Sequence, residues 1–291
     1  MASAQQITTR PSPAARRLAQ RLGAYAVMLG LLGLLAVILF PFVVITINAV
    51  KSPDEYASYG PLALPGRLYL QGIIDFWNRV DFSNKLVNSL VISLSVALLG
   101  VALSLLNAFA LGIGRVRGRV ALLIFFMVAN TLPQEALAYP LYYFAKFFGI
   151  YDTRFAVILV FSVIQSAFGT YLLSSVFSTL PREMIEAAQI DGCTKLQLLL
   201  RIILPTSLPT LSVLFTFFFV WTWNEFFLPL ILLVSNAKQT VPLAIAVLQG
   251  QYNMDATTSS ASALLGILPC VLFFVLFQRT LTRGITAGSV K

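Results

Sequence analysis

The stretch LVNSLVISLSVALLGVALSLLNAFALGIG, residues 86–114, contains 29 residues without a charged side chain. A second uncharged run extends over 24 residues, from Ala24 to Ile47. Because an α-helix crosses the hydrocarbon core of a bilayer, roughly 30 Å thick, with about 20 apolar residues, either run is long enough to span a membrane. These runs predict a helical membrane protein.

The composition of the whole chain supports this interpretation. Of the 291 residues, 58% are hydrophobic and 11% are charged, whereas soluble domains carry about 25% charged residues. We expect an all-α polytopic protein with six transmembrane helices. They lie at residues 24–47, 86–113, 120–145, 155–178, 208–234 and 257–277.

Two regions depart from this regular pattern. The third expected span is interrupted by Pro133, Glu135 and Pro140. The longest connection, from Asn48 to Lys85, is rich in proline, glycine and aromatic residues, which favours an ordered external loop with one or two short helices.

The basic residues predict the orientation in the membrane, since cytoplasmic loops carry an excess of Lys and Arg. Thirteen of the 20 basic residues lie in the N-terminal tail, the 114–119 loop, the 179–207 segment and the C-terminal tail. The remaining seven lie in the other connections. Both termini are therefore expected in the cytoplasm. The predicted organisation is a basic tail at residues 1–23, a transmembrane domain at 24–279 with a cytoplasmic loop at 179–207, and a second tail at 280–291.

The net charge of +9 would suggest nucleic-acid binding in a soluble chain. Here the basic residues flank apolar runs, so membrane topology explains them and no nucleic-acid partner is expected. The chain has no histidine, and its two cysteines, Cys193 and Cys270, lack metal-ligand spacing. No P-loop sequence occurs. We therefore expect no metal site, no catalytic residues and no cofactor bound by this chain.

Residues 181–205, PREMIEAAQIDGCTKLQLLLRIILP, form the longest polar interruption in the second half of the chain. Pro181 is suited to open a helix, and Gly192 to end it in the left-handed conformation. One face of this helix has small residues at its centre and consists of Met184, Ala187, Ala188 and Asp191.

Thr194 can cap a second helix, which would rest at the membrane interface. Its apolar face, at helical spacing, consists of Leu196, Leu199, Leu200 and Ile203. The 179–207 segment is either a simple connector between spans or a docking surface for a cytoplasmic partner. The alanines flanked by Glu186 and Asp191 favour docking.

The same segment resembles the cytoplasmic loop of binding-protein-dependent ABC import permeases. That loop has E-A-A, three residues, G, nine residues and I-x-L-P, and this chain has Glu186-Ala187-Ala188, Gly192 and Ile202-Ile203-Leu204-Pro205. Trp223-Asn224-Glu225-Phe226 is similar to the W-N-E-F of carbohydrate permeases. The tail from Arg283 to Lys291 resembles the end of the second, maltose-type permease subunit. The resemblance extends from Tyr25 onward.

The resemblance implies a type I ABC importer permease fold in the bacterial inner membrane. The expected partners are a second permease subunit, two ATP-binding subunits that hold ATP and Mg²⁺, and an extracytoplasmic sugar-binding protein. The residues expected to contact the ATPase are Glu186, Ala187, Ala188, Asp191 and Gly192. In the tail, Gly284 and Gly288 would either insert between the ATPases or belong to a frayed terminus.

Within the membrane, Glu135 and Glu225 are ionisable residues, which usually face a bundle interior or a wet cavity. The residues expected to line a sugar path are Trp221, Trp223, Asn224 and Glu225. Alternatively, Asn224 and Glu225 hold neighbouring helices in register. Glycerophosphodiesters and polyamines remain possible solutes, and a secondary transporter or a membrane-embedded enzyme are the competing classes of function.

Overall fold

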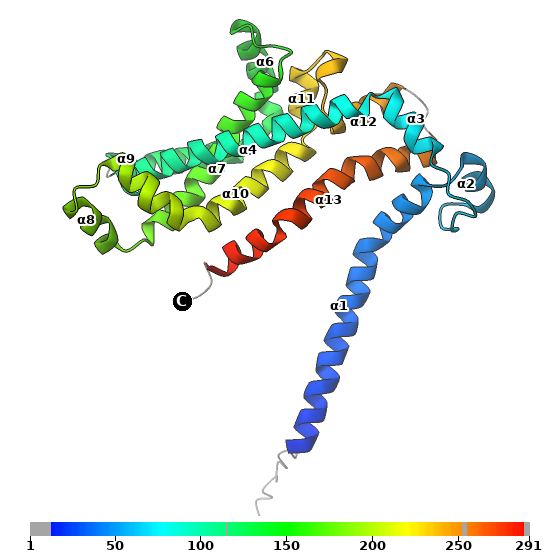
Figure 1. Cartoon of the computed structure of the whole chain (residues 1–291), viewed down its shortest axis with the longest axis horizontal. Helices are drawn as coiled ribbons and strands as arrows, with labels where there is room; N and C mark the ends of the chain where they lie inside the picture. Colours follow the sequence, from blue (N-terminus) through cyan, green and yellow to red (C-terminus); the bar gives the residue numbers. More distant parts are fainter. Residues whose placement is uncertain (1–12, 115, 252–254, 288–291) are drawn as a thin grey trace, which may run out of the picture.

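The computed structural model describes residues 13–114, 116–251 and 255–287, and the described residues form helices and connections without a strand. Four long helices are continuous: α1 (Pro13–Ala49), α4 (Phe82–Gly112), α7 (Arg154–Ser178) and α13 (Ala256–Ala287). Helices α1 and α13 remain helical through Pro41 and Pro269. The predicted all-α membrane architecture is confirmed (Figure 1).

A fifth long helix extends without a break over 30 residues, Lys195–Asn224. It consists of α9 (Lys195–Leu198), the π-helical segment η2 (Leu199–Ile203) and α10 (Leu204–Asn224). Pro205 lies at the start of α10, directly after the π-helical segment. The expected interfacial helix after Thr194 and the first part of the expected fifth span, residues 208–224, are thus one element, whereas residues 225–234 lie beyond its end.

The third expected span is divided into two segments. Helix α5 (Arg119–Thr131) is followed by η1 (Gln134–Leu137) and α6 (Ala138–Phe147), and the direction changes by 95° at the break. Leu132 and Pro133 adopt extended backbone conformations there. Because proline lacks an N–H and disfavours helix in the preceding residue, Pro133 explains the break. The described residues contain five helices long enough to cross a membrane, or six if this bent pair is one span.

Short helices occupy the end of the bundle where α4 begins. The 48–85 connection contains α2 (Pro53–Tyr59) and α3 (Gln71–Arg79), as the sequence predicted. After α10 the chain forms α11 (Phe227–Leu232), η3 (Asn236–Lys238) and α12 (Val241–Gln251). Helix α12 was not predicted from the sequence. Helix α8 (Arg182–Ile190) lies at the opposite end (Figure 1).

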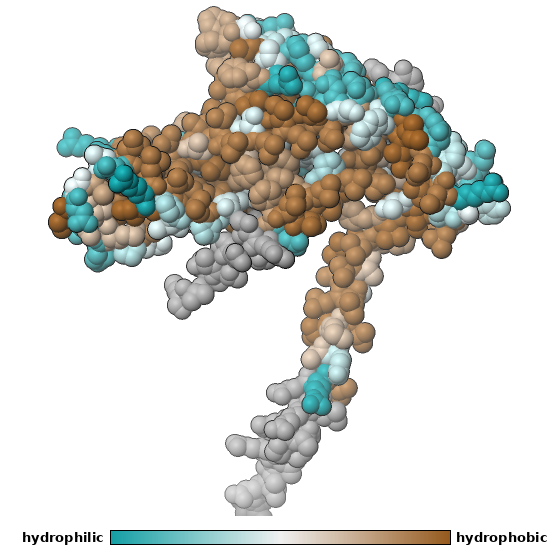
Figure 2. Space-filling view, in the orientation of Figure 1, coloured by the Kyte–Doolittle hydropathy of each residue, from teal (hydrophilic) through white to brown (hydrophobic). Residues whose placement is uncertain are grey.

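The core lies where α4 packs between α7 and α10, with α13 along α10 (Figure 1). Its centre includes Leu105, Phe177, Ile203 and Phe218, all at most 8% exposed. The outer surface of the bundle is apolar as well, which a lipid environment permits (Figure 2). The C-terminal end of α1 contacts α13, and the rest of α1 projects from the bundle (Figure 1).

Candidate coupling loop and translocation pocket

Helix α8 has the ends that its sequence predicts. Pro181 precedes its first residue with extended backbone, and Glu183 lies in its first turn. Gly192 follows it with a φ of +77°, the left-handed conformation that favours glycine. The N–H of Cys193 donates to the carbonyl of Ala188 at 3.0 Å and closes the helix end. The turn at Gly192 therefore fixes the direction in which the chain leaves α8.

The two alanines of α8 lie in different environments. Ala188 is 5% exposed and packs in the bundle core, whereas Ala187 is exposed together with Glu186 and Asp191. The face that the sequence predicted, with both alanines displayed together, is therefore divided between the bundle and the surface. Ile190, which the sequence analysis did not single out, is 86% exposed. The displayed surface thus combines carboxylates with small and apolar side chains.

The helix after Gly192 begins with a capping box. The Thr194 hydroxyl accepts from the N–H of Gln197, and the N–H of Thr194 donates to the Gln197 side chain at 2.8 Å. Two orphan N–H groups are satisfied in this way, so the start of the long helix is firmly defined beside α8.

The buried face of this helix differs from the predicted one. Leu198, Leu199 and Ile203 are at most 5% exposed, whereas Leu196 and Leu200 are at least half exposed. The π-helical segment η2 begins directly after Leu198 and interrupts the spacing of 3.6 residues per turn on which the prediction rested. Two of the four predicted residues, Leu199 and Ile203, thus share the buried face.

The predicted C-terminal contact lies at the edge of the described structure. The backbone of Gly284 belongs to α13, which continues as a helix to Ala287. Gly288 lies outside the described residues.

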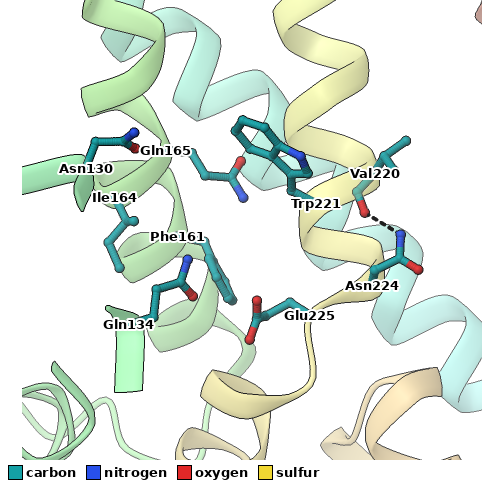
Figure 3. Close-up of a pocket in the computed structure, with 9 residues that line it drawn as sticks. All are labelled: Asn130, Gln134, Phe161, Ile164, Gln165, Val220, Trp221, Asn224 and Glu225. Carbon is teal, nitrogen blue, oxygen red and sulfur yellow. Dashed lines mark hydrogen bonds between the residues drawn. The ribbon is translucent and has the colours of Figure 1, made fainter. Parts of the chain in front are cut away.

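A pocket of about 290 Å³ lies between α5, α7 and α10 (Figure 3). From α7, Gln165 and Phe161 line it; from α10, Trp221 and Asn224 do so, and Glu225 closes one side. Figure 3 shows the side chains of Gln165 and Glu225 reaching into the space between the α7 and α10 ribbons. The complete lining consists of Asn130, Gln134, Phe161, Ile164, Gln165, Val220, Trp221, Asn224 and Glu225.

Two helix breaks meet at this pocket. One is the break after α5, between Asn130 and Gln134. The other is at Glu225, whose extended backbone ends α10 and whose carboxylate accepts from the N–H of Phe227 at 3.0 Å. Irregular backbone at membrane depth is tolerated where it is buried in protein or lines a cavity. The breaks therefore indicate a polar cavity within the bundle.

Gln165 is the pocket residue with unused hydrogen-bonding capacity. Its Nε2 donates to the Thr222 hydroxyl at 2.9 Å, while its Oε1 is buried without a hydrogen-bond partner among the described residues. The side chain as a whole is 6% exposed. A buried amide oxygen of this kind is costly unless a ligand or water satisfies it.

The structure brings together three of the four predicted pathway residues, namely Trp221, Asn224 and Glu225. Trp223 lies elsewhere: it is 2% exposed, stacks with Phe219 and donates its indole N–H to the carbonyl of Gly266 at 3.3 Å. Glu135 lies in η1 but does not line the pocket. Asn130, Gln134 and Gln165 were not predicted as pocket residues, although each is an amide within an expected span.

Comparisons with known proteins identify relatives of the chain. Residues 100–287 match the family described as "Binding-protein-dependent transport system inner membrane component". The chain is 31% identical over 278 residues to the inner membrane ABC transporter permease protein YcjP of Escherichia coli (strain K12), covering 95% of this chain and 98% of the relative. It is 30% identical to the probable starch degradation products transport system permease protein AmyC of Thermoanaerobacterium thermosulfurigenes, covering 86% and 91%.

A solved structure has the same fold. It is a chain of a bacterial ABC transporter involved in the import of the acidic polysaccharide alginate. The TM-score is 0.73 at 20% sequence identity, and the match covers 94% of this chain and 99% of that one.

Proposed function

The chain belongs to the family of binding-protein-dependent transport system inner membrane components, and on that basis we propose that it is a permease subunit of an ATP-driven sugar importer. In this proposal α8 receives the movement of a cytoplasmic ATPase, and the pocket at Gln165 and Glu225 lies on the path of the sugar. The chain itself performs no catalysis.

The observation that carries the proposal is the long helix Lys195–Asn224. It begins three residues after Gly192, beside α8, and ends at the pocket with Trp221 and Asn224. With a rise of about 1.5 Å per residue, its 30 residues extend over about 45 Å. A displacement of α8, which is fixed to the same core through Ala188, can therefore reach the pocket through one continuous element.

The proposal includes three kinds of partner. A second permease subunit completes the pathway, and two ATP-binding subunits hold ATP and Mg²⁺ and dock on α8 of each permease. An extracytoplasmic binding protein delivers the solute. A related structure contains the alginate transporter in complex with a pentasaccharide-bound periplasmic protein, which supports a partner of this kind. The transporter would work by alternating access, switching between an inward-open and an outward-open state. The binding protein would favour the outward-open state by its higher affinity for that state.

A sugar is the substrate class that the pocket and the relatives favour. The lining offers amide, carboxylate and indole groups, which bond hydroxyl groups and stack on sugar rings. Relatives are described as permeases for diacetylchitobiose and trehalose. Glycerophosphodiesters and polyamines are the competing solutes. Binding of the cognate extracytoplasmic binding protein to a panel of sugars and to these competing solutes identifies the substrate class.

The proposed topology places both termini and α8 in the cytoplasm of a bacterial cell. Its support is the excess of Lys and Arg in the connections of that side. Labelling of cysteines introduced at exposed Asp191 and Asp54 by an impermeant reagent, in intact cells and in inverted vesicles, tests it.

Reconstituted transport tests the proposal as a whole. In proteoliposomes that contain this chain and its partners, we expect sugar uptake that requires ATP and continues without an ion gradient. Uptake that follows a proton or sodium gradient and ignores ATP would indicate a secondary transporter instead.

A variant of the pocket tests the path of the sugar. Gln165→Leu should lower uptake while the ATPase subunits remain bound. Ser162→Ala, which alters another buried polar residue of α7 outside the pocket, should leave uptake unchanged. Thr222→Val removes the partner of the Gln165 amide but retains the amide itself, so it separates the packing contribution from contact with the solute.

A further inference from the structure

A second cavity, of about 530 Å³, lies at the end of the bundle that carries α8. Its walls come from the end of α4, the start of α5, the end of α7, α8 and the start of the long helix. The full lining is Phe109, Gly112, Ile113, Gly114, Arg119, Phe177, Ser178, Leu180, Arg182, Ile185, Glu186, Gln189, Lys195 and Leu198. The transport proposal uses α8 but assigns no role to this cavity.

The charge of the cavity is positive. Arg119, Arg182 and Lys195 approach it from three separate elements, and Glu186 is its carboxylate. Within the described part of the chain, none of the three basic side chains forms an ion pair or a hydrogen bond. Three cations that face one cavity without internal partners repel one another, and an anion between them would remove that repulsion.

The backbone adds to this positive character. Arg119 and Arg182 are the first residues of α5 and α8, and neither helix has a side-chain hydrogen bond from its N-cap residue, Gly118 or Pro181. Unsatisfied N–H groups and the helix dipole favour an anion at such ends. The basic side chains and the two helix ends are therefore complementary to the same charge.

The remaining wall is apolar. It is lined by Phe109, Ile113, Phe177, Leu180 and Leu198. These side chains lie where the apolar core between α4, α7 and the long helix ends. A small hydrated anion would gain no stabilisation from contact with an apolar wall. A phospholipid would, since its phosphate lies at the level where the helices end and its acyl chains extend into the apolar zone. Basic pockets between helices at the membrane surface bind acidic headgroups in this way.

We propose that this cavity binds the phosphate group of an anionic phospholipid, with Arg119, Arg182 and Lys195 around the phosphate. The part of an acyl chain nearest the headgroup would lie against Phe177 and Leu180. The assignment to the cytoplasmic leaflet rests on the proposed topology, whereas the binding itself does not depend on transport. A bound lipid would connect the start of α5 to α8 and hold α8 against the bundle.

Native mass spectrometry of the assembled transporter tests this directly. After exchange into equal amounts of phosphatidylglycerol and phosphatidylethanolamine, we expect phosphatidylglycerol to be retained preferentially. In the variant with Arg119→Gln, Arg182→Gln and Lys195→Gln, retention should fall by about tenfold or more, because each basic residue near a membrane surface attracts acidic lipid. Arg117→Gln and Arg201→Gln alter exposed basic residues outside the cavity and should retain the lipid.

Glu186→Gln supplies a second test, which can still be made if the triple variant misfolds. It removes the cavity's carboxylate, so retention of phosphatidylglycerol should rise. Equal retention of both lipids, or unchanged retention in the triple variant, would overturn the proposal. Displacement of the lipid by millimolar inorganic phosphate would also overturn it, since the cavity would then be a site for a free anion. Lipid retention in a complex that fails to transport would contradict the proposed function and leave this inference standing.

Discussion

The carboxylate of Asp152 accepts a hydrogen bond from the N–H of Ser235 at 3.0 Å, across 83 positions of sequence. It also accepts from the N–H of Val234 at 3.0 Å and from the Ser235 hydroxyl, and it forms an ion pair of 3.0 Å with Lys238. One side chain before α7 thus holds the connection between α11 and α12. Lys85 and Asn88 of α4 donate to the carbonyls of Asn236 and Ala237 in the same connection.

Replacement of Asp152 by Asn should loosen residues 234–238. Asn also tolerates the left-handed φ of +56° that Asp152 adopts, so the change removes charge while the backbone conformation stays accessible. Because hydrogen bonds to charged groups contribute about 1.5–3 kcal/mol, amide protection at Ser235 should fall by about tenfold or more in hydrogen-exchange mass spectrometry. Asp75→Asn, at an exposed pair with Gln71, should leave this segment unchanged.

The same contact predicts the pH range in which the segment stays ordered. Burial raises the pKa of Asp152, but the hydrogen bonds from Ser235 and the charge of Lys238 outweigh it and hold this pKa well below its ordinary value of about 3.9. A depressed pKa gives stabilisation that is present above the unfolded-state value and is lost as pH falls through the folded-state value. Protection of residues 234–238, corrected for intrinsic exchange, should therefore be equal at pH 8 and pH 5. A transition with a midpoint near pH 6 would contradict this assignment.

Replacement of Gly192 by Val should impair coupling without preventing insertion. A side chain at Gly192 would meet open space, so the cost arises from the φ of +77°. The left-handed conformation costs about 1–2 kcal/mol for L-residues, and the turn would relax and redirect α8. We expect lower sugar-stimulated ATP hydrolysis at a normal level of membrane-inserted protein.

Gly60→Val is the matched control for this experiment. Gly60 has a φ of +78° and equally open surroundings, but it lies in the 48–85 connection at the other end of the bundle. Because Gly60 also has a ψ of −178°, a backbone region open essentially only to glycine, its replacement should introduce at least as much strain and leave the coupling ratio unchanged. Equal loss of coupling in both variants would mean that general destabilisation explains the Gly192 result.

The two adjacent alanines of α8 should respond differently to replacement by leucine. Ala188→Leu would overpack the core, at a cost of about 1–3 kcal/mol, and should lower the unfolding temperature of the solubilised protein. Ala187→Leu adds an exposed side chain, so it should leave the unfolding temperature unchanged and reduce co-purification of the ATPase subunits. If Ala187→Leu lowered the unfolding temperature and Ala188→Leu reduced co-purification of the ATPase subunits, the docking face would lie on the opposite side of α8 from the one assigned here.

Close packing of α7 on α4 depends on Gly169. A Cβ at this position would overlap the Ser104 side chain, with the Ser104 Cβ at 2.7 Å and Phe218 Cζ at 3.0 Å. Gly169→Ala should therefore destabilise the bundle, as measured by thermal unfolding in detergent. Gly33→Ala introduces the same methyl group on α1, where nothing lies within 4 Å, and should be neutral.

Much of the fold could be predicted from the sequence, because membrane spans depend on the length and hydropathy of local segments. The uncharged run at residues 86–114 became α4, and the left-handed turn at Gly192 was predicted from one residue type. The 95° break after α5 was missed, although Pro133 was noted, since a proline can also kink a span without dividing it.

The features that escaped prediction depend on packing between distant segments. The burial of Ala188 depends on the direction of α8 relative to the core, and periodicity alone does not contain this direction. Gln165 joins the pocket because two breaks, near Asn130 and at Glu225, are brought beside it. Each of these residues is ordinary in its local sequence, and their grouping appears in the tertiary structure.

The π-helical segment at Leu199–Ile203 has a consequence for how such chains vary in length. In an α-helix one residue corresponds to about 100° of rotation, and a π-helical turn accommodates one residue more than an α-helical turn. Deletion of a single residue there would replace the π-helical turn by an α-helical one, so α8 and the downstream part of the long helix would keep nearly the same angular relation. The long helix can therefore lose one residue at this point, and only at this point, while α8 and the pocket stay aligned.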